Sequence, residues 1–261
     1  MDKKKILERL QTPKAVRWFW IILCAPVALI LLLLLLTRLG AFGKLPTFEE
    51  LENPKSNLAT EIYSDDGEMI GSFFIQNRSY VDYNELSPAL VAALISTEDM
   101  RFYSHSGIDF ISLARVAVKT LALGNRRQGG GSTITQQLLR NQVIWKGNGS
   151  SVYEKITRKI QEQYLAVQLE QKLDKEQILE YYLNTINLGQ NAIGVQNASM
   201  RYFNKDISQL SISEAAVLAG TQQNPTDDNP ITNPEDNATR RKKVLDNMLD
   251  QGWIDQAAHD E

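Results

Sequence analysis

The apolar residues of this chain gather in one long run near its start. Residues Trp18 to Thr37 include no charged side chain, and about twenty such residues cross a hydrocarbon layer of roughly 30 Å. Six basic residues precede the run, whereas only Arg38 and Lys44 closely follow it. Because basic residues stay on the cytoplasmic side, the pattern predicts a transmembrane helix with a cytoplasmic N-terminus and everything after residue 40 outside. The run ends without the cleavage site of a signal peptide.

Helical spacing of apolar positions dominates the rest of the chain. The expected helices are 88–102, 110–123, 133–143, 153–172 and 175–188, and after a loop 212–220 and 234–251. Asp174 with Gln177 predicts a capping box, and Gly189 a helix stop. Two short β-prone runs around Asp66-Gly67 predict a hairpin between Glu61 and Phe73.

These elements predict a mainly α-helical protein. The expected parts are a cytoplasmic tail (1–17), a transmembrane helix (18–37), a tether (38–58), a folded domain (59–253) and a C-terminal tail or linker start (254–261). The net charge of -3 gives no sign of nucleic-acid binding. The single cysteine, Cys24, lies inside the apolar run, which excludes a disulfide framework and a cysteine-based zinc site.

The first stretch with candidate chemistry is Ile95 to Asp109. Glu98 comes three residues after Ile95 and four after Leu94, so its carboxylate is expected at the edge of a buried helix face. Partial burial raises the pKa of a carboxyl group and makes it a better base near neutral pH. An ordinary solvent-exposed helix end is the competing interpretation, which the nearby Phe102 and His105 weaken.

The second stretch, Gln128 to Asn141, carries three glycines into a helix rich in Thr and Gln. Free N–H groups at such a helix start favour an anionic or polyhydroxylated ligand. The spacing does not fit a nucleotide-binding P-loop. A flexible linker with a Ser cap is the alternative.

The third stretch places Arg158, Lys159 and Glu162 together on one helix. Such a group is typical of an exposed ion-pair surface. It would also serve as a cationic clamp for a pyrophosphate leaving group.

The motifs together resemble the peptidoglycan glycosyltransferase family 51, found in class A penicillin-binding proteins and monofunctional transglycosylases. The matching patterns are E-D-x-x-F-x-x-H-x-G at Glu98 to Gly107, G-G-S-T-I-T-Q-Q-L-x-R-N at Gly130 to Asn141, R-K-x-x-E at Arg158 to Glu162, and Y-L-N-x-x-x-L-G at Tyr182 to Gly189. The resemblance implies a lysozyme-like helical fold with a small jaw subdomain at the membrane. It also implies polymerisation of lipid II into β-1,4-linked glycan strands, with inversion and release of undecaprenyl pyrophosphate.

The resemblance also implies roles for individual residues. Glu98 looks like the general base for the acceptor 4-hydroxyl, and Glu162 looks like the donor-side group that acts with Arg158 and Lys159 on the pyrophosphate. The other expected site residues, lining the substrate cleft or shaping the surroundings of the base, are Asp99, Phe102, His105, Thr133, Gln137, Arg140 and Asn141. Arg140 stands where many members carry Lys, which alters geometry more than charge.

Several matters stay open at this stage. A divalent cation, Mg²⁺ or Mn²⁺, near Glu98 or Glu162 is left open as a cofactor. No cluster of side chains in the sequence has the spacing of metal ligands, so the sequence alone does not demonstrate a metal site. The expected partners are lipid II with the growing lipid-linked strand, the bilayer and other cell-wall synthesis proteins. The resemblance alone implies moenomycin-type inhibitors as donor-site ligands. The residues contain no S-x-x-K or K-T-G, so they hold no penicillin-binding transpeptidase. Whether the chain is monofunctional or a piece of a bifunctional enzyme is undecided.

Two other functions compete with polymerisation. One is a lytic, glycan-cleaving enzyme of lysozyme-like fold, which would not need the Arg158 and Lys159 cluster to bind a pyrophosphate. The other is an inactive cell-wall scaffold, against which Glu98 and Glu162 both argue. Phe73 and Phe74 are expected to meet lipid.

Overall fold

The computed structural model describes residues 13–43, 45, 60–63, 69–73, 79–123, 130–142 and 151–261. The chain divides into two compact units. Unit 1 comprises Met1–Leu45 and Gly147–Tyr164, and unit 2 comprises Pro46–Lys146 and Leu165–Glu261. Most of the tether (44 and 46–58), the Asp66-Gly67 turn, Phe74 and Gly129 lie outside the described residues, as does the side chain of Phe73.

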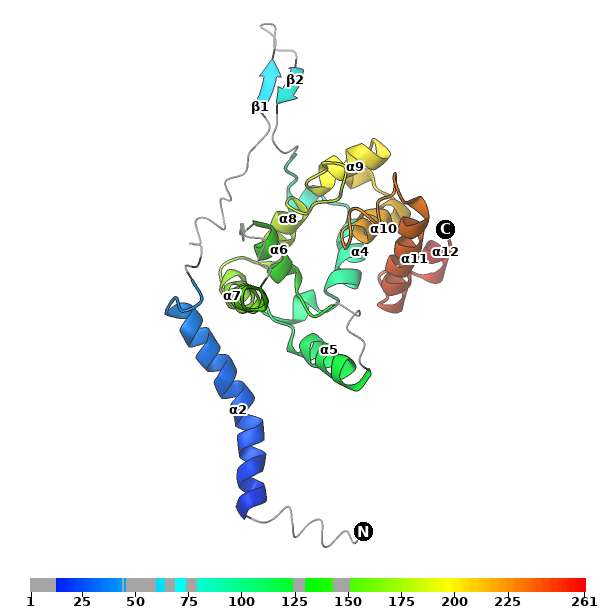
Figure 1. The fold of residues 1–261 in the computed structure, drawn as a ribbon. Helices are drawn as coiled ribbons and strands as arrows, with labels where there is room; N and C mark the ends of the chain where they lie inside the picture. The colour runs from blue at the N-terminus through cyan, green and yellow to red at the C-terminus, as the bar shows by residue number, and fades with distance from the viewer. Residues whose placement is uncertain are drawn as a thin grey trace. The chain divides into compact units, whose positions relative to one another are not determined.

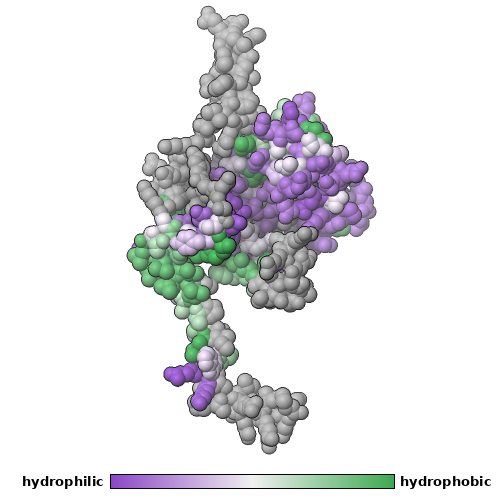
Figure 2. Space-filling view, in the orientation of Figure 1, coloured by the Kyte–Doolittle hydropathy of each residue, from purple (hydrophilic) through white to green (hydrophobic). Residues whose placement is uncertain are grey.

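Unit 1 contains helix α2, Pro13–Arg38, and the first part of helix α7, Val152–Glu170. Described side chains of α2 such as Trp18 and Leu35 are exposed, and apolar surface covers much of this helix in Figure 2. Among the residues that the structure describes, no helix combines the length and apolar character that crossing a membrane requires. The transmembrane span Trp18–Thr37 stays a prediction from the sequence.

The predicted hairpin is present as two antiparallel strands, β1 (Thr60–Tyr63) and β2 (Met69–Phe73). Thr60 pairs with Phe73, and Ile62 pairs with Gly71. Apart from an isolated bridge between Asn187 and Ile193, this is the sheet structure of the described residues.

The core of unit 2 is helical, as predicted (Figure 1). Helices α4 (Pro88–Glu98), α10 (Ile212–Thr221) and α11 (Pro234–Asp250) pack on one another, and α6 (Ile134–Gln142) packs on α8 (Lys175–Leu183). Helix α5, Phe110–Leu123, has the predicted bounds. The other elements of the described residues are α9 (Val195–Phe203), α12 (Gln256–Asp260) and the short 3₁₀ helices η1 (Tyr83–Glu85), η2 (Phe102–Ser104) and η3 (Ile207–Gln209).

Two helix ends differ from the prediction by more than two residues. Helix α4 stops at Glu98, and Phe102 belongs to the separate helix η2. Helix α8 stops at Leu183 because the Asn184 side chain binds the backbone of Val81 in both directions, as acceptor at 2.9 Å and donor at 2.8 Å. The predicted capping box of Asp174 and Gln177 is confirmed.

Candidate active site

Glu98 ends α4 at the border between core and solvent. Leu94 and Ile95 are buried one turn earlier, and Glu98 itself is half-buried, as the sequence predicted. Its Oε2 accepts a hydrogen bond of 2.9 Å from Nε2 of Gln137 on α6. The carboxylate borders a pocket between the end of α4, helix α5 and residues 130–133.

The surroundings of Glu98 favour its protonated form. Burial raises the pKa of the carboxyl group above its ordinary value, and Asp99 adds to the rise. The hydrogen bond from Gln137 and the charges of Arg240 and Lys243 oppose it. The net rise is the direction that general-base chemistry near neutral pH requires.

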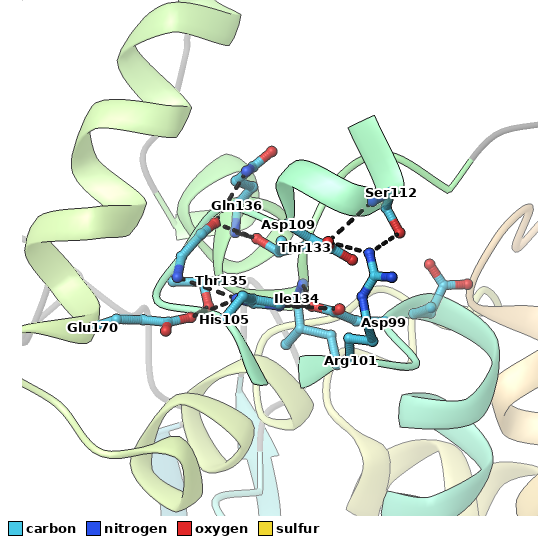
Figure 3. Close-up of polar contacts among 12 residues, drawn as sticks. Asp99, Arg101, His105, Asp109, Ser112, Thr133, Ile134, Thr135, Gln136 and Glu170 are labelled. Carbon is cyan, nitrogen blue, oxygen red and sulfur yellow. Dashed lines mark hydrogen bonds and ion pairs between the residues drawn. The ribbon is translucent and has the colours of Figure 1, made fainter. Parts of the chain in front are cut away.

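Asp99 ties three segments of unit 2 together (Figure 3). Its buried carboxylate accepts the N–H of Ile134 at 3.0 Å, at the start of α6, and lies 2.9 Å from Nε2 of His105. The N–H of Gly107 donates to Nδ1 of His105 at 3.2 Å. A neutral His105 ring therefore carries its proton on Nε2, facing Asp99. This arrangement makes His105 a support for Asp99.

Gly107 allows the loop after His105 to approach α7 closely. Its φ is +88°, and a Cβ at this position would lie 2.6 Å from the carbonyl carbon and oxygen of Ala166. Both the left-handed backbone and the lack of space require glycine here.

Two of the first backbone N–H groups of α6 are bound by side chains of the protein. Oγ1 of Thr133 donates to the carbonyl of Gly107 at 2.8 Å and accepts the N–H of Gln136 at 3.2 Å. With Ile134 bound to Asp99, the expectation of free N–H groups for a ligand is wrong at Ile134 and Gln136. The cap instead fixes α6, which carries Gln137, to the loop that follows Glu98.

A second polar cluster supports the same loop from α7 and α8. Nζ of Lys175 donates to Glu170 at 2.7 Å and to the carbonyl of His105 at 2.8 Å, and it lies 4.3 Å from the ring centroid of Phe102. Glu170 also accepts a hydrogen bond from Thr135. The sequence-predicted Phe102 is fully buried in this cluster, so it shapes the loop from inside.

Asp109 fixes the start of α5 beside the pocket. Its carboxylate pairs with Arg101 and accepts the N–H groups of Ile111 at 3.1 Å and Ser112 at 3.0 Å. Burial raises the pKa of Asp109, but the hydrogen bonds from Ser112 and the pairing with Arg101 outweigh it and hold the pKa down at about 2. Asp109 is therefore ionised across the working range of pH.

Arg140 and Asn141 are exposed in the last part of α6. Gln137 lies one turn before both of them, so the helix carries a polar row away from Glu98. The geometry suits contact with a large substrate outside the core.

In unit 1, the predicted cluster on α7 surrounds a buried carboxylate. Nζ of Lys159 lies 3.2 Å and Nε of Arg158 lies 3.8 Å from the oxygens of Glu162. The side chain of Glu162 is 1% exposed, whereas those of Arg158 and Lys159 are 35% and 36% exposed. A buried carboxylate departs from the ordinary surface ion pair, because burial costs free energy that such a pair avoids.

Sequence reasoning missed four polar residues that hold the site together. Tyr182 and Gln222 bind Gln137, and Glu170 and Lys175 support the His105 loop. Tyr182 stood inside a quoted motif, but nothing in its helical pattern separated it from a core aromatic residue. Within the described ranges, no three His, Cys, Asp or Glu side chains lie close enough together to hold a metal ion.

Comparison with known proteins decides the family. A family model described as Transglycosylase matches residues 66–249, well over half of the chain. The chain belongs to the transglycosylase family. This confirms the resemblance to glycosyltransferase family 51 and the enzyme class, a peptidoglycan glycosyltransferase.

Curated relatives of this transglycosylase include longer penicillin-binding proteins. Penicillin-binding protein 1A of Neisseria lactamica is 39% identical over 234 residues, which are 88% of this chain and 28% of that protein. Penicillin-binding protein 1A of Escherichia coli is 40% identical over 218 residues, 84% of this chain and 25% of that protein. The crystal structure of penicillin-binding protein 1A from Haemophilus influenzae aligns at a TM-score of 0.43 and 24% identity, over 77% of this chain and 20% of that one. The chain thus spans about a quarter of the length of these relatives.

Proposed function

We propose that this transglycosylase polymerises lipid II into β-1,4-linked glycan strands, with inversion and release of undecaprenyl pyrophosphate. The observation that carries the proposal is the environment of Glu98. It is a half-buried carboxyl group with a raised pKa at the edge of a pocket, and Gln137 holds it at 2.9 Å. Family membership supplies the reaction class.

In the proposed reaction, Glu98 takes the proton from the 4-hydroxyl of the acceptor sugar. The freed oxygen forms a bond to the anomeric carbon of the donor, and the bond from that carbon to pyrophosphate breaks with its electron pair leaving on the pyrophosphate. Attack on the face opposite the leaving group inverts the anomeric centre.

The departing pyrophosphate gains negative charge, which Arg158 and Lys159 are suited to neutralise. In the proposal Glu162 holds these two cations in place from its buried position. Mg²⁺ or Mn²⁺ is a further hypothesis, and no step is assigned to it. Chelation with EDTA during polymerisation tests that hypothesis.

The remaining residues of the site have supporting roles in the proposal. Asp99, Phe102, His105 and Thr133 fix the loop and helix that flank Glu98, as their buried contacts support. Gln137, Arg140 and Asn141 line the path of the substrate along α6.

Membrane anchoring completes the proposal. The uncharged run Trp18–Thr37 anchors the enzyme in the bacterial plasma membrane with the N-terminus in the cytoplasm. The catalytic part then meets lipid II, a membrane-bound substrate, from the outer side. Carbonate extraction of membranes, and protease protection of the N-terminus, test anchor and orientation.

The test of function is polymerisation of labelled lipid II by the chain in detergent. Strands from the parent and none from Glu98→Gln support the proposal. Shortening of preformed strands would favour a lytic enzyme, and binding of lipid II without product would favour a scaffold.

A further inference from the structure

The side chain of Gln137 connects four helices of unit 2. Its Nε2 donates to Glu98 at the end of α4, and its Oε1 accepts bonds of 2.9 Å from the hydroxyl of Tyr182 on α8 and of 2.9 Å from Nε2 of Gln222, which caps α10. Tyr182 is fully buried, so its hydroxyl is held in place by packing. Its hydrogen bonds thus join the packed group α4–α10–α11 to the packed pair α6–α8.

An amide has a donor end and an acceptor end, so its two orientations are not equivalent. With two donors against Oε1, the NH₂ group of Gln137 faces Glu98. Turning the amide over would set Oε1 against a carboxylate oxygen and NH₂ against the NH₂ of Gln222. The contact with the carboxylate would leave an acceptor without a donor, at a cost of about 1–3 kcal/mol. The contact with Gln222 would be repaired only if that amide turned over as well, since its buried Oε1 has no hydrogen-bond partner among the described residues.

Resting on the proposed role of Glu98, we propose that Tyr182 and Gln222 are positioning residues that lock the Gln137 amide with its N–H toward the catalytic carboxylate. The lock stabilises the form of Glu98 that accepts a proton and aims it at the pocket. Without the lock, the amide turns over and accepts a hydrogen bond from protonated Glu98, so the inactive form of the base gains stability.

The charges around this network agree with the lock. The pKa of Tyr182 lies well above 10, through burial and the nearby charge of Glu98, so its hydroxyl remains a donor at working pH. Asp99 raises the pKa of Glu98, whereas Arg240 and Lys243 on α11 lower it. The carboxylate of Glu98 attracts the N–H end of the Gln137 amide, and the donors of Tyr182 and Gln222 hold its oxygen end in the same direction.

The experiment compares Tyr182→Phe and Gln222→Met with the parent in lipid II polymerisation across pH. Each variant removes one donor from Oε1 of Gln137 and nearly preserves shape. The lock predicts a loss of kcat of about tenfold near neutral pH, the worth of one buried hydrogen bond, and an acid limb of the kcat/KM profile that moves to higher pH. Tyr80→Phe is the matched control, because it removes a phenol that binds Glu180, away from Glu98, and its profile should match the parent.

A double-mutant cycle separates the lock from a general packing effect. In a Gln137→Met background there is no amide to orient, so Tyr182→Phe and Gln222→Met should cause no further loss. Equal losses with and without Gln137 would overturn the lock, and so would pH profiles identical to that of the parent.

A titration that needs no activity keeps the two proposals apart. Carboxyl ¹³C NMR of glutamate-labelled protein, with the Glu98 signal assigned by Glu98→Gln, reports the pKa of this group directly. The lock predicts a higher Glu98 pKa in Tyr182→Phe and Gln222→Met than in the parent, and an unchanged value would overturn it. If the parent forms no polymer, the proposed function fails and the titration alone judges the lock.

Discussion

The carboxylate of Asp99 accepts the backbone N–H of Ile134 at 3.0 Å, so the residue that follows the proposed base also caps helix α6. Glu98 and Gln137 are held on either side of this contact, and they meet at 2.9 Å. An anion at a helix N-terminus is favoured by the helix dipole. The geometry of the proposed base thus depends on the fixed start of the neighbouring helix.

The raised pKa of Glu98 predicts a trade between stability and activity. A carboxyl group whose pKa is higher folded than unfolded stabilises the fold below its unfolded pKa, and that contribution is lost as pH rises through the folded value. Glu98→Gln should therefore have a higher Tm than the parent at neutral pH and an equal or lower Tm near pH 4. Thermal unfolding at both pH values measures this, and a variant less stable at neutral pH would contradict it.

The lowered pKa of Asp109 predicts the opposite dependence of folding stability on pH. Its pKa is held down at about 2 by Arg101 and Ser112, so its contribution is present above the unfolded pKa near 3.9 and is lost as pH falls through the folded value. Asp109→Asn should cost roughly 2 kcal/mol of unfolding free energy at neutral pH. The gap between parent and variant should narrow between about pH 4 and pH 2. A cost that does not change with pH would mean that packing, and not charge, accounts for it.

Replacing Gly107 by alanine should cost more unfolding free energy than replacing an ordinary glycine whose backbone is in the left-handed region. Gly107→Ala meets the backbone of Ala166 at 2.6 Å, whereas Gly252, with φ +74°, has nothing within 4 Å of the added Cβ. Gly252→Ala should cost about 1–2 kcal/mol from backbone strain, and Gly107→Ala clearly more. Urea unfolding of both variants is the measurement. Equal costs would show that the approach to α7 is not tight.

The contacts of Lys175 with the loop around His105 predict that replacing this lysine lowers the free energy of unfolding. Lys175→Met keeps most of the apolar length of the side chain but removes the bonds to Glu170 and to the carbonyl of His105. It leaves Glu170 buried without its cation, so the variant should lose about 3 kcal/mol of unfolding free energy. Lys242→Met, which removes an exposed ion pair with Asp246, is the control and should lose far less, because such surface pairs contribute little to stability. Similar losses in the two variants would contradict the support role of Lys175.

The sequence predicted the elements whose ends carry local signals. Helix α5 begins and ends where the pattern placed it, and the Asp174 capping box starts α8. Helix α9 was missed because Gly194, with φ +81°, precedes it without a polar side-chain cap. The end of α8 depends on Asn184 binding Val81, a contact between residues 103 apart, which no local pattern can show.

Local sequence patterns had the same limit in the candidate active site, where contacts between distant residues could not be predicted. The position of Glu98 at the edge of the core followed from helical spacing, and so did the grouping of Arg158, Lys159 and Glu162. The partners of Gln137 did not, because Tyr182 and Gln222 lie 45 and 85 residues away from it. The exclusion of solvent from Glu162 likewise depends on packing that spacing does not reveal.

The central claim is that Glu98 is the base of glycan polymerisation, and the most direct test is the rate of lipid II polymerisation by the parent and by Glu98→Gln as a function of pH. The account predicts a rate that rises with pH through the raised pKa of Glu98, and a loss of about a hundredfold or more in the variant, with its fold retained. A variant that polymerises at the rate of the parent would contradict it.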